Sequence, residues 1–150
     1  MSLESDIAIL SKVGFFSDFN EDQLRMVAFG SEKMKLPEGE ILYNDGDDAF
    51  DGVVLLSGEI EVTRPKPDGS IYSNTMQPGS LLGEISLLTP NHRIGTATVI
   101  QNSEILIVHR ETVLRVLNEY PDLAVRLFKK ISTSVTQFDT ELLKMDGRFN

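Results

Sequence analysis

The pattern of apolar and polar residues divides the chain into a helical beginning, a strand-rich middle and a helical end. In residues 1–30, apolar positions recur at helical spacing, and Asn20 is a suitable N-cap for the second of two short helices. In residues 31–110 the pattern changes to short apolar runs bounded by Gly or Pro. Helical spacing returns over residues 111–146. We therefore expect a single domain over residues 1–150 that is mainly β with flanking helices.

The strand-rich middle is expected to form an antiparallel double sheet. Ile60 and Val62 alternate with acids, which is typical of a strand with one buried face. The sequence Lys-Pro-Asp-Gly at 66–69 predicts a hairpin turn. About eight strands separated by such turns predict an eight-stranded antiparallel β-roll or jelly roll, with N-terminal helices and a long C-terminal helix. The strands are expected at 33–36, 41–43, 53–56, 59–63, 71–76, 95–100 and 104–109.

Residues 78–99 contain the groups that an anion-binding loop needs. Gly83 directly precedes Glu84, and Arg93 follows nine residues after Glu84. A glycine lets the backbone approach a ligand closely, and the amides that open a helical turn point toward an anion. An arginine can bind a phosphate through two hydrogen bonds, and a carboxylate can accept hydrogen bonds from hydroxyl groups beside it. The combination suits a sugar phosphate.

Charge and composition limit the possible partners. The net charge is −9, and the excess of acids lies in the first half of the chain. General nucleic-acid binding needs a basic face, so no nucleic-acid partner is expected. The start of the chain does not resemble a signal peptide and no apolar run approaches the length of a membrane span, so we expect a cytoplasmic protein without membrane contact. A negative field also repels a phosphate, so Arg93 has to offset it locally.

Other chemistry-bearing residues are not spaced as catalytic or metal sites. The chain has no cysteine and only two histidines, which is too few for the metal cluster of a jelly-roll metalloenzyme. Four closely spaced acids superficially resemble a calcium loop: Asp45, Asp47, Asp48 and Asp51. The spacing of an EF-hand would place Phe50 at its glycine and Leu56 at its bidentate glutamate. We expect a solvated acidic loop there, a solvent-facing His92, no metal, no cofactor and no enzyme activity.

In the last helix, apolar residues recur at alternating spacings of three and four. They are Phe128, Ile131, Val135, Phe138, Leu142 and Met145. This pattern is typical of helices that pair in a coiled coil, so we expect a parallel homodimer with the first five at its interface. The alternative is a helix that packs on its own domain. Only five residues follow Met145, so we expect no helix-turn-helix or other output domain, and output through an effector protein or the dimer interface.

The candidate anion loop also resembles a known motif. The sequences GEISL at 83–87 and RIGT at 93–96 resemble the phosphate-binding cassette of the cyclic nucleotide-binding domains. These domains occur in bacterial catabolite-activator-type regulators, cyclic-nucleotide-dependent kinases and gated channels. The segment 55–62 and the glycines of the turns also fall where the family places them, so the resemblance spans roughly residues 10–140. It implies a β-roll, a regulatory function, cAMP or cGMP as ligand, and a last helix that pairs subunits and covers the nucleotide.

The resemblance implies a role for each residue of the loop. Arg93 would pair with the cyclic phosphate, and Glu84 would accept a hydrogen bond from the ribose 2′-OH. Ile94 stands where the family often has a Ser or Thr that assists cGMP binding, and its lack of a hydroxyl favours cAMP. The phosphate cradle would be completed by backbone amides near Gly83, Ile85 and Ser86.

The positions that meet the base depart from the family pattern. In the catabolite activator a Thr-Ser pair on the last helix contacts the base, and the matching residues here are Phe138, which could stack on a purine, and Asp139. Three interpretations stay open. The first is a cyclic nucleotide receptor in which the ligand shifts the placement of the C-terminal helices. The second is a degenerate, ligand-free dimerisation or interaction module, which Ile94 and Asp139 support. The third is a jelly-roll enzyme or sugar binder, which the scarcity of histidines disfavours.

Overall fold

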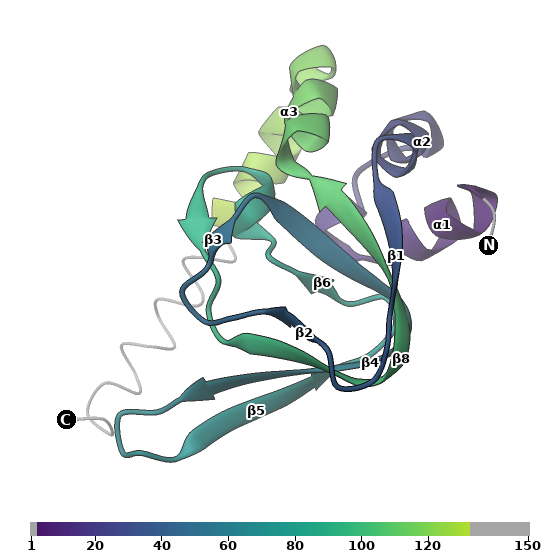
Figure 1. Ribbon diagram of the computed structural model, residues 1–150. Helices are drawn as coiled ribbons and strands as arrows, with labels where there is room; N and C mark the ends of the chain where they lie inside the picture. Colours follow the sequence, from purple (N-terminus) through teal and green to yellow (C-terminus); the bar gives the residue numbers. More distant parts are fainter. Residues whose placement is uncertain (1–2, 133–150) are drawn as a thin grey trace. The chain divides into compact units, whose positions relative to one another are not determined.

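The computed structural model of the protein describes residues 3–132, and Figure 1 shows how its elements are arranged. The helices are α1 (Leu3–Leu10), η1 (Gly14–Phe16), α2 (Glu21–Phe29), η2 (Ile85–Leu87) and α3 (Arg110–Glu119), followed by a helical segment at 121–132. The strands are β1 (Glu32–Leu36), β2 (Ile41–Tyr43), β3 (Asp48–Ala49), β4 (Asp51–Pro65), β5 (Ile71–Met76), β6 (Leu81–Leu82), β7 (Asn91–His92) and β8 (Thr96–His109). The predicted fold class, mainly β with helices before and after the strands, is confirmed.

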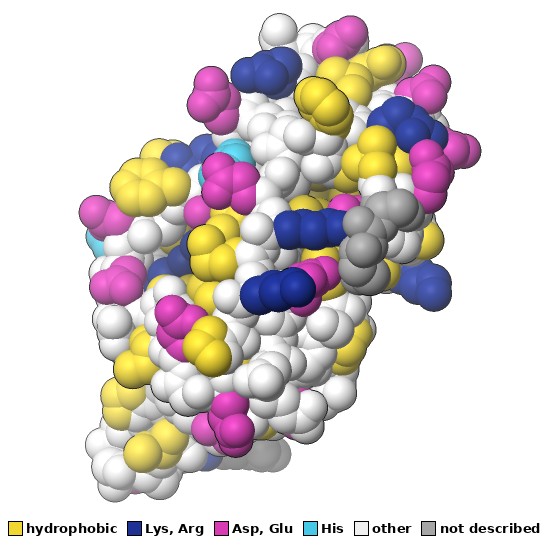
Figure 2. Space-filling view, turned by 45° about the vertical axis from the view of Figure 1, so that its right-hand side comes forward, with side chains coloured by type: hydrophobic (Ala, Val, Ile, Leu, Met, Phe, Trp, Pro, Cys, Tyr) yellow, Lys and Arg dark blue, Asp and Glu magenta, His cyan; other side chains and the backbone are white. Residues whose placement is uncertain are grey.

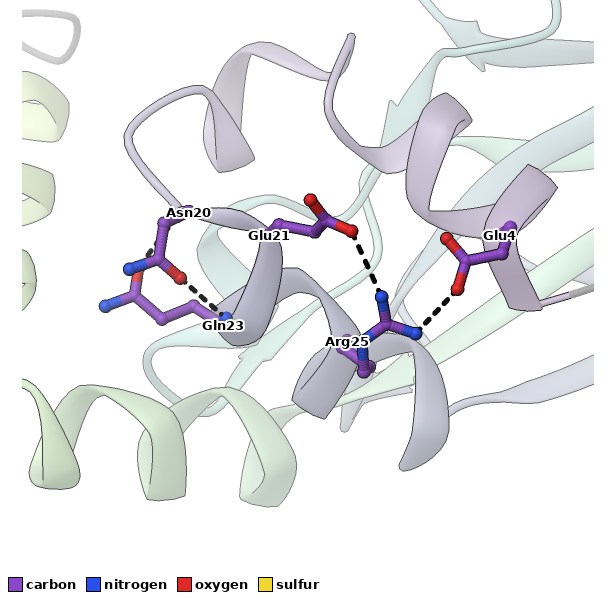
Figure 3. A network of polar contacts seen from close by, with 5 residues as sticks. All are labelled: Glu4, Asn20, Glu21, Gln23 and Arg25. Carbon is purple, nitrogen blue, oxygen red and sulfur yellow. Dashed lines mark hydrogen bonds and ion pairs between the residues drawn. The ribbon is translucent and has the colours of Figure 1, made fainter.

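The N-terminal helices are fixed by a capping box and by one arginine. The Asn20 side chain accepts a hydrogen bond from the Gln23 amide at 2.9 Å, and the Gln23 side chain accepts one from the Asn20 amide at 2.8 Å. This reciprocal pair satisfies two amides that have no partner within the helix, and it confirms the predicted N-cap of α2. Arg25 on α2 donates to Glu4 of α1 at 2.6 Å and to Glu21 at 3.1 Å, so it joins the two helices (Figure 3).

Antiparallel pairing joins most of the strands into one sheet. The strand order is β1-β8-β4-β5, with β2 also paired to β8 and β6 also paired to β4, which gives six strands. β3 and β7 form a separate sheet of two strands. The ladder between β4 and β8 runs from Asp51 opposite His109 to Thr63 opposite Thr96. The strands thus form the predicted β-roll, a curled sheet of six strands accompanied by a sheet of two strands, and the two long central strands β4 and β8 are continuous.

These two strands are longer than the sequence predicts. The turn signals predict a break after Leu56 in β4 and after Ile100 in β8, but both strands continue. Gly58 has a φ of +93°, and a Cβ at this position would collide with Ser103 on β8. The register of the ladder shifts at the same place, as in a β-bulge. Gly58 is therefore needed for a bend within a strand, which the sequence pattern cannot distinguish from a turn.

The core has one part inside the curled sheet and one on its other face. The inner cluster consists of Leu36, Val53, Leu55, Ile60, Ala97, Val99 and Ile105. In β4, residues 52–56 are all buried, so the outer face is covered as well. α1 contacts β4, and Lys33 Nζ of β1 lies 3.1 Å from the buried carboxylate of Asp6 on α1. The N-terminal helices thus provide the outer cover.

The chain divides into two compact units, residues 1–116 and 117–150. In the second unit the helical segment begins at Pro121, as predicted, because proline is well tolerated in the first turn of a helix. Phe128, the first residue of the heptad pattern, is 50% exposed. The interface residues Val135, Phe138 and Leu142 lie outside the described residues, as does Asp139, so the homodimer stays a prediction.

The surface seen in Figure 2 mixes the two signs of charge. Lysines, arginines and acids are interspersed with exposed apolar side chains, and on this face the described residues form no continuous basic area. Binding to a nucleic-acid backbone depends on such an area. Within residues 3–132, no helix combines the length and apolar composition that a membrane span requires.

Candidate functional site

Residues 78–99 form a folded loop that short strands hold near both ends. β6 pairs with β4 on one side, and β7 pairs with β3 on the other. Between them lies η2, whose Leu87 is fully buried. Leu87 packs against Gly52 of β4 so closely that an added Cβ on Gly52 would lie 3.0 Å from Leu87 Cγ. The loop is thus anchored to the central strand of the sheet.

Arg93 follows β7 and is the buried cation of this loop. Its side chain is 8% exposed, and its Nη2 lies 2.6 Å from Asp51 Oδ1 at the start of β4. The guanidinium carbon lies 4.6 Å from the ring centroid of Tyr43, which is the geometry of a cation–π contact. The other terminal nitrogen, Nη1, is buried without a hydrogen-bond partner. The guanidinium is therefore held in place while one strong donor stays unused.

Gly83 provides the space for this guanidinium. Its φ is +86°, a conformation that residues with a side chain rarely adopt. A Cβ on Gly83 would collide with Arg93 Nη1 and would lie 3.1 Å from the carbonyl oxygen of Asp51. Glycine is therefore required here both by the backbone conformation and by the close approach of the arginine.

The residues after Gly83 form a single tight turn. Glu84 is exposed at the start of η2, and the amides of Ile85 and Ser86 open the turn, where amides have no partner within the helix. The buried Ser86 hydroxyl donates to Asn91 Oδ1 at 2.8 Å, so it closes the loop internally. The turn thus presents a carboxylate and backbone donors.

These groups line a pocket of about 240 Å³. It is lined by Tyr43, Val62, Leu81, Leu82, Gly83, Glu84, Ile85, Ser86, Asn91, His92, Arg93 and Ile94. One end carries the arginine and the turn of η2, and the remaining wall is largely apolar. Burial raises the pKa of the Tyr43 phenol above its ordinary value of 10.0, and the positive charge of Arg93 offsets part of that rise. A pocket with one buried cation, few polar groups and an apolar wall suits a small organic anion.

The acidic segment 45–51 differs from its prediction at one position. Asp45, Asp47 and Asp48 are exposed, as expected of a solvated loop, but Asp51 is only 27% exposed and pairs with Arg93. The segment also holds the loop by further contacts: Asp45 Oδ1 with the Gly95 amide at 2.8 Å, Asp47 O with the Arg93 amide at 2.7 Å, and Asp48 Oδ1 with His92 Nε2 at 3.1 Å. Among the described residues, no group of three potential ligands is placed to hold a metal ion.

The structure brings together the predicted ligand-binding residues that it describes. Gly83, Glu84, Ile85, Ser86, Arg93 and Ile94 all line the pocket, whereas Phe138 lies outside the described residues. His92 is exposed, as predicted. Sequence reasoning missed Asp51 and Tyr43. Asp51 was hidden by its acidic neighbours, and Tyr43 carries no signal that separates it from an ordinary strand residue.

The loop and its pocket lie in a part of the chain that matches a known protein family. The model of the family described as "Cyclic nucleotide-binding domain" matches residues 33–120, which is more than half of the chain and includes the whole loop. The chain belongs to the cyclic nucleotide-binding domain family. Domains of this family are regulatory binding modules, and we refer to the loop 78–99 below as the cassette.

Individual relatives support the same family. A CRP-like cAMP-activated global transcriptional regulator of Mycobacterium tuberculosis is 21% identical over 135 residues, which cover 89% of this chain and 60% of the relative. The chain thus spans 60% of the length of this curated relative. The structure of a cyclic nucleotide-binding-like protein from Brucella abortus is 31% identical, covers 75% of this chain and 97% of that one, and has a TM-score of 0.67.

The fold alone is shared with a further solved structure. The N-terminal domain of a transcriptional regulator from Streptomyces coelicolor is 22% identical and has a TM-score of 0.79. The similarity covers 89% of this chain and 94% of that domain. Strands, turns and helices are therefore kept in the same arrangement although most residues differ.

Proposed function

We propose that this domain binds a cyclic nucleotide, with cAMP favoured over cGMP, and that binding repositions the C-terminal helices. The protein then acts as a non-enzymatic sensor in the cytoplasm. Its signal passes through a homodimer formed by the last helix, with Phe128, Ile131, Val135, Phe138 and Leu142 at the interface, or through an effector protein. The base would be recognised in part by Phe138.

One observation carries the proposal: Arg93 has a buried Nη1 without a hydrogen-bond partner at the wall of the pocket. A buried donor that stays unpaired costs free energy, and a ligand oxygen that accepts from it recovers that cost. Asp51 occupies only Nη2, and a guanidinium has five N–H donors. A phosphate oxygen is a suitable acceptor because charge-assisted hydrogen bonds to arginine are strong.

The turn of η2 supports the remainder of the ligand. The amides of Ile85 and Ser86 can donate to the phosphate, and the exposed carboxylate of Glu84 can accept from a ribose hydroxyl. The apolar wall suits the faces of a ribose and a purine.

The preference for cAMP rests on Ile94. Ile94 lines the pocket and is 67% exposed, and it has no hydroxyl to bond the amino group and N–H that distinguish guanine from adenine. A site that lacks such a partner gains nothing from these guanine groups and leaves them poorly paired if they are buried. The relative from Mycobacterium tuberculosis is named as cAMP-activated, which agrees with this preference.

A ligand-free interaction module is the second candidate. It is favoured by the Arg93–Asp51 ion pair, because a carboxylate already neutralises the cation that a phosphate would need. In that case the cassette would be structural, and the exposed Phe128 side of the last helix would be the functional surface.

Thermal unfolding with cAMP and, separately, with cGMP distinguishes the two candidates. A ligand at about 100 times its dissociation constant stabilises the native state by roughly 2.7 kcal/mol, which is a rise in Tm on the order of 5–10 °C for a domain of this size. We expect the larger rise with cAMP and none in Arg93→Ala. Arg115→Ala is the matched control because Arg115 is 69% exposed on α3, and it should keep the full rise. No rise with either nucleotide at millimolar concentration would favour the ligand-free module.

A further inference from the structure

Arg110, the first residue of α3, forms hydrogen bonds with η2 of the cassette and with the neighbouring strand β3. Its Nε donates to the carbonyl oxygen of Ser86 in η2 at 2.7 Å, and its Nη2 donates to the carbonyl oxygen of Ala49 in β3 at 2.5 Å. Its own amide donates to the carbonyl oxygen of Phe50 at 3.3 Å. One residue therefore joins α3 to two segments that lie 24 and 61 positions away in the sequence.

One of the two carbonyl groups belongs to the cassette, and the other belongs to β3, the strand that pairs with β7 of the cassette. Ser86 lies in η2 and lines the pocket, and its hydroxyl donates to Asn91. Ala49 lies in β3, which pairs with β7, and Arg93 directly follows β7. If η2 moves relative to the paired strands β3 and β7, the distance between the carbonyl groups of Ser86 and Ala49 changes. Both of these groups accept hydrogen bonds from Arg110.

An arginine suits this arrangement for a physical reason. The guanidinium is planar, so the directions of its N–H groups are fixed relative to one another, and hydrogen bonds from a charged donor are stronger than neutral ones. A lysine has a single ammonium group and cannot reproduce this fork. Both acceptors are neutral carbonyl groups, so the strength of the contact depends on their positions and not on attraction between two opposite charges.

A second connection reaches the same point of the chain. Asp51, the partner of Arg93, lies opposite His109 in the ladder between β4 and β8, and His109 directly precedes Arg110. Arg93 is thus connected to the start of α3 through Asp51 and His109, and η2 is connected to it through Ser86 and Arg110.

We propose that Arg110 is a positioning residue that transmits occupancy of the cassette to the first turn of α3. The proposal rests on the proposed function, because it takes the nucleotide phosphate as the ligand that shifts η2 relative to β7. When the phosphate binds the amides of η2 and Arg93, the geometry at the Ser86 and Ala49 carbonyls changes, and α3 follows through the fork of Arg110. The two placements of α3 then differ in their affinity for nucleotide.

Hydrogen exchange of the whole chain tests this relay, first without nucleotide. Arg110→Gln removes the charge and the fork, and Arg110→Lys keeps the charge and an aliphatic stem should the first variant fail to fold. We expect exchange to accelerate by roughly tenfold in residues 85–89 and 110–113 together, the equilibrium factor that one charge-assisted hydrogen bond provides. Arg115→Gln and Arg115→Lys are the matched controls on the exposed side of α3. Arg115 pairs with the exposed Glu111 at 3.8 Å, so we expect at most about a twofold change in residues 110–113 and none in residues 85–89.

The second arm adds saturating cAMP. In the wild type we expect the nucleotide to change exchange in residues 110–113, and in Arg110→Lys we expect binding to persist while this change disappears. An Arg110→Lys protein that binds cAMP and changes in 110–113 as the wild type does would overturn the relay. A wild type that does not bind would overturn the proposed function and the relay together, and the nucleotide-free arm would still show whether Arg110 joins the two segments.

Discussion

The Nη2 atom of Arg93 lies 2.6 Å from Oδ1 of Asp51, although the two residues are 42 positions apart in the sequence. The pair orients the guanidinium and neutralises part of its charge before any ligand arrives. It therefore opposes phosphate binding electrostatically while it favours binding geometrically, and these two contributions can be separated by substitution.

Asp51→Asn keeps an oxygen that can accept from Arg93 and removes the negative charge. We expect the nucleotide-free protein to lose roughly 1–3 kcal/mol of stability, less than a fully buried pair would lose because Asp51 is partly exposed. The rise in Tm on adding cAMP should become larger than in the wild type, because the phosphate then supplies the missing negative charge. Differential scanning calorimetry with and without cAMP measures both effects.

Asp48→Asn is the control for that comparison. Asp48 belongs to the same acidic segment, but its contact with His92 is exposed, so we expect a change in stability within about 0.5 kcal/mol. A smaller nucleotide-induced rise in Asp51→Asn than in the wild type would mean that orientation by the carboxylate outweighs its charge.

Gly83→Ala should abolish most nucleotide binding. The added methyl group would collide with Arg93 Nη1, so the guanidinium must move, and the loss of its hydrogen bonds to phosphate lowers affinity by roughly ten- to a hundredfold. Gly79→Ala is a matched control, because Gly79 has a φ of +92° and open space around the missing side chain. Both variants should lose about 1–3 kcal/mol of stability, because an alanine is strained at a positive φ. Equal affinities of the two variants for cAMP in a titration would therefore contradict the predicted collision.

Tyr43 gives the protein a pH dependence in the alkaline range. Because the pKa of Tyr43 is raised in the folded state, its contribution to stability is complete below the ordinary value of 10.0 and is lost as the pH rises through the folded value. Absorbance titration should show one of the three tyrosines ionising last, and Tyr43→Phe should remove that step. The free energy of unfolding should also fall less steeply above about pH 10 in Tyr43→Phe than in the wild type. A late ionisation step that persists in Tyr43→Phe would show that another tyrosine is the late one.

The sequence predicts the helix starts and the grouping of Gly83, Glu84 and Arg93 at one pocket because these features depend on local signals. The capping residue Asn20, the helix start at Pro121 and the spacing of Glu84 and Arg93 are all set by residues close together in the chain. Their physical causes, unpaired amides and the fixed φ of proline, act over a few residues.

Features that depend on distant contacts could not be predicted. Gly58 looks like a turn residue, and only the approach of Ser103 from β8 shows why a glycine is needed within the strand. Asp51 is indistinguishable from its acidic neighbours until Arg93 folds back onto it. Tyr43 matters only because the same arginine lies over its ring. These relationships require knowledge of the fold and not of the pattern alone.

The long ladder between β4 and β8 has a consequence for how this domain can evolve. Residues 78–95 of the cassette lie between these two strands in the sequence, and the pairing of the strands closes them as a surface loop whose entropic cost grows only slowly with length. Insertions or exchanges within the loop therefore leave the scaffold intact. New ligand chemistry can arise there while the sheet is conserved, which agrees with a TM-score of 0.79 at only 22% identity to the Streptomyces coelicolor domain.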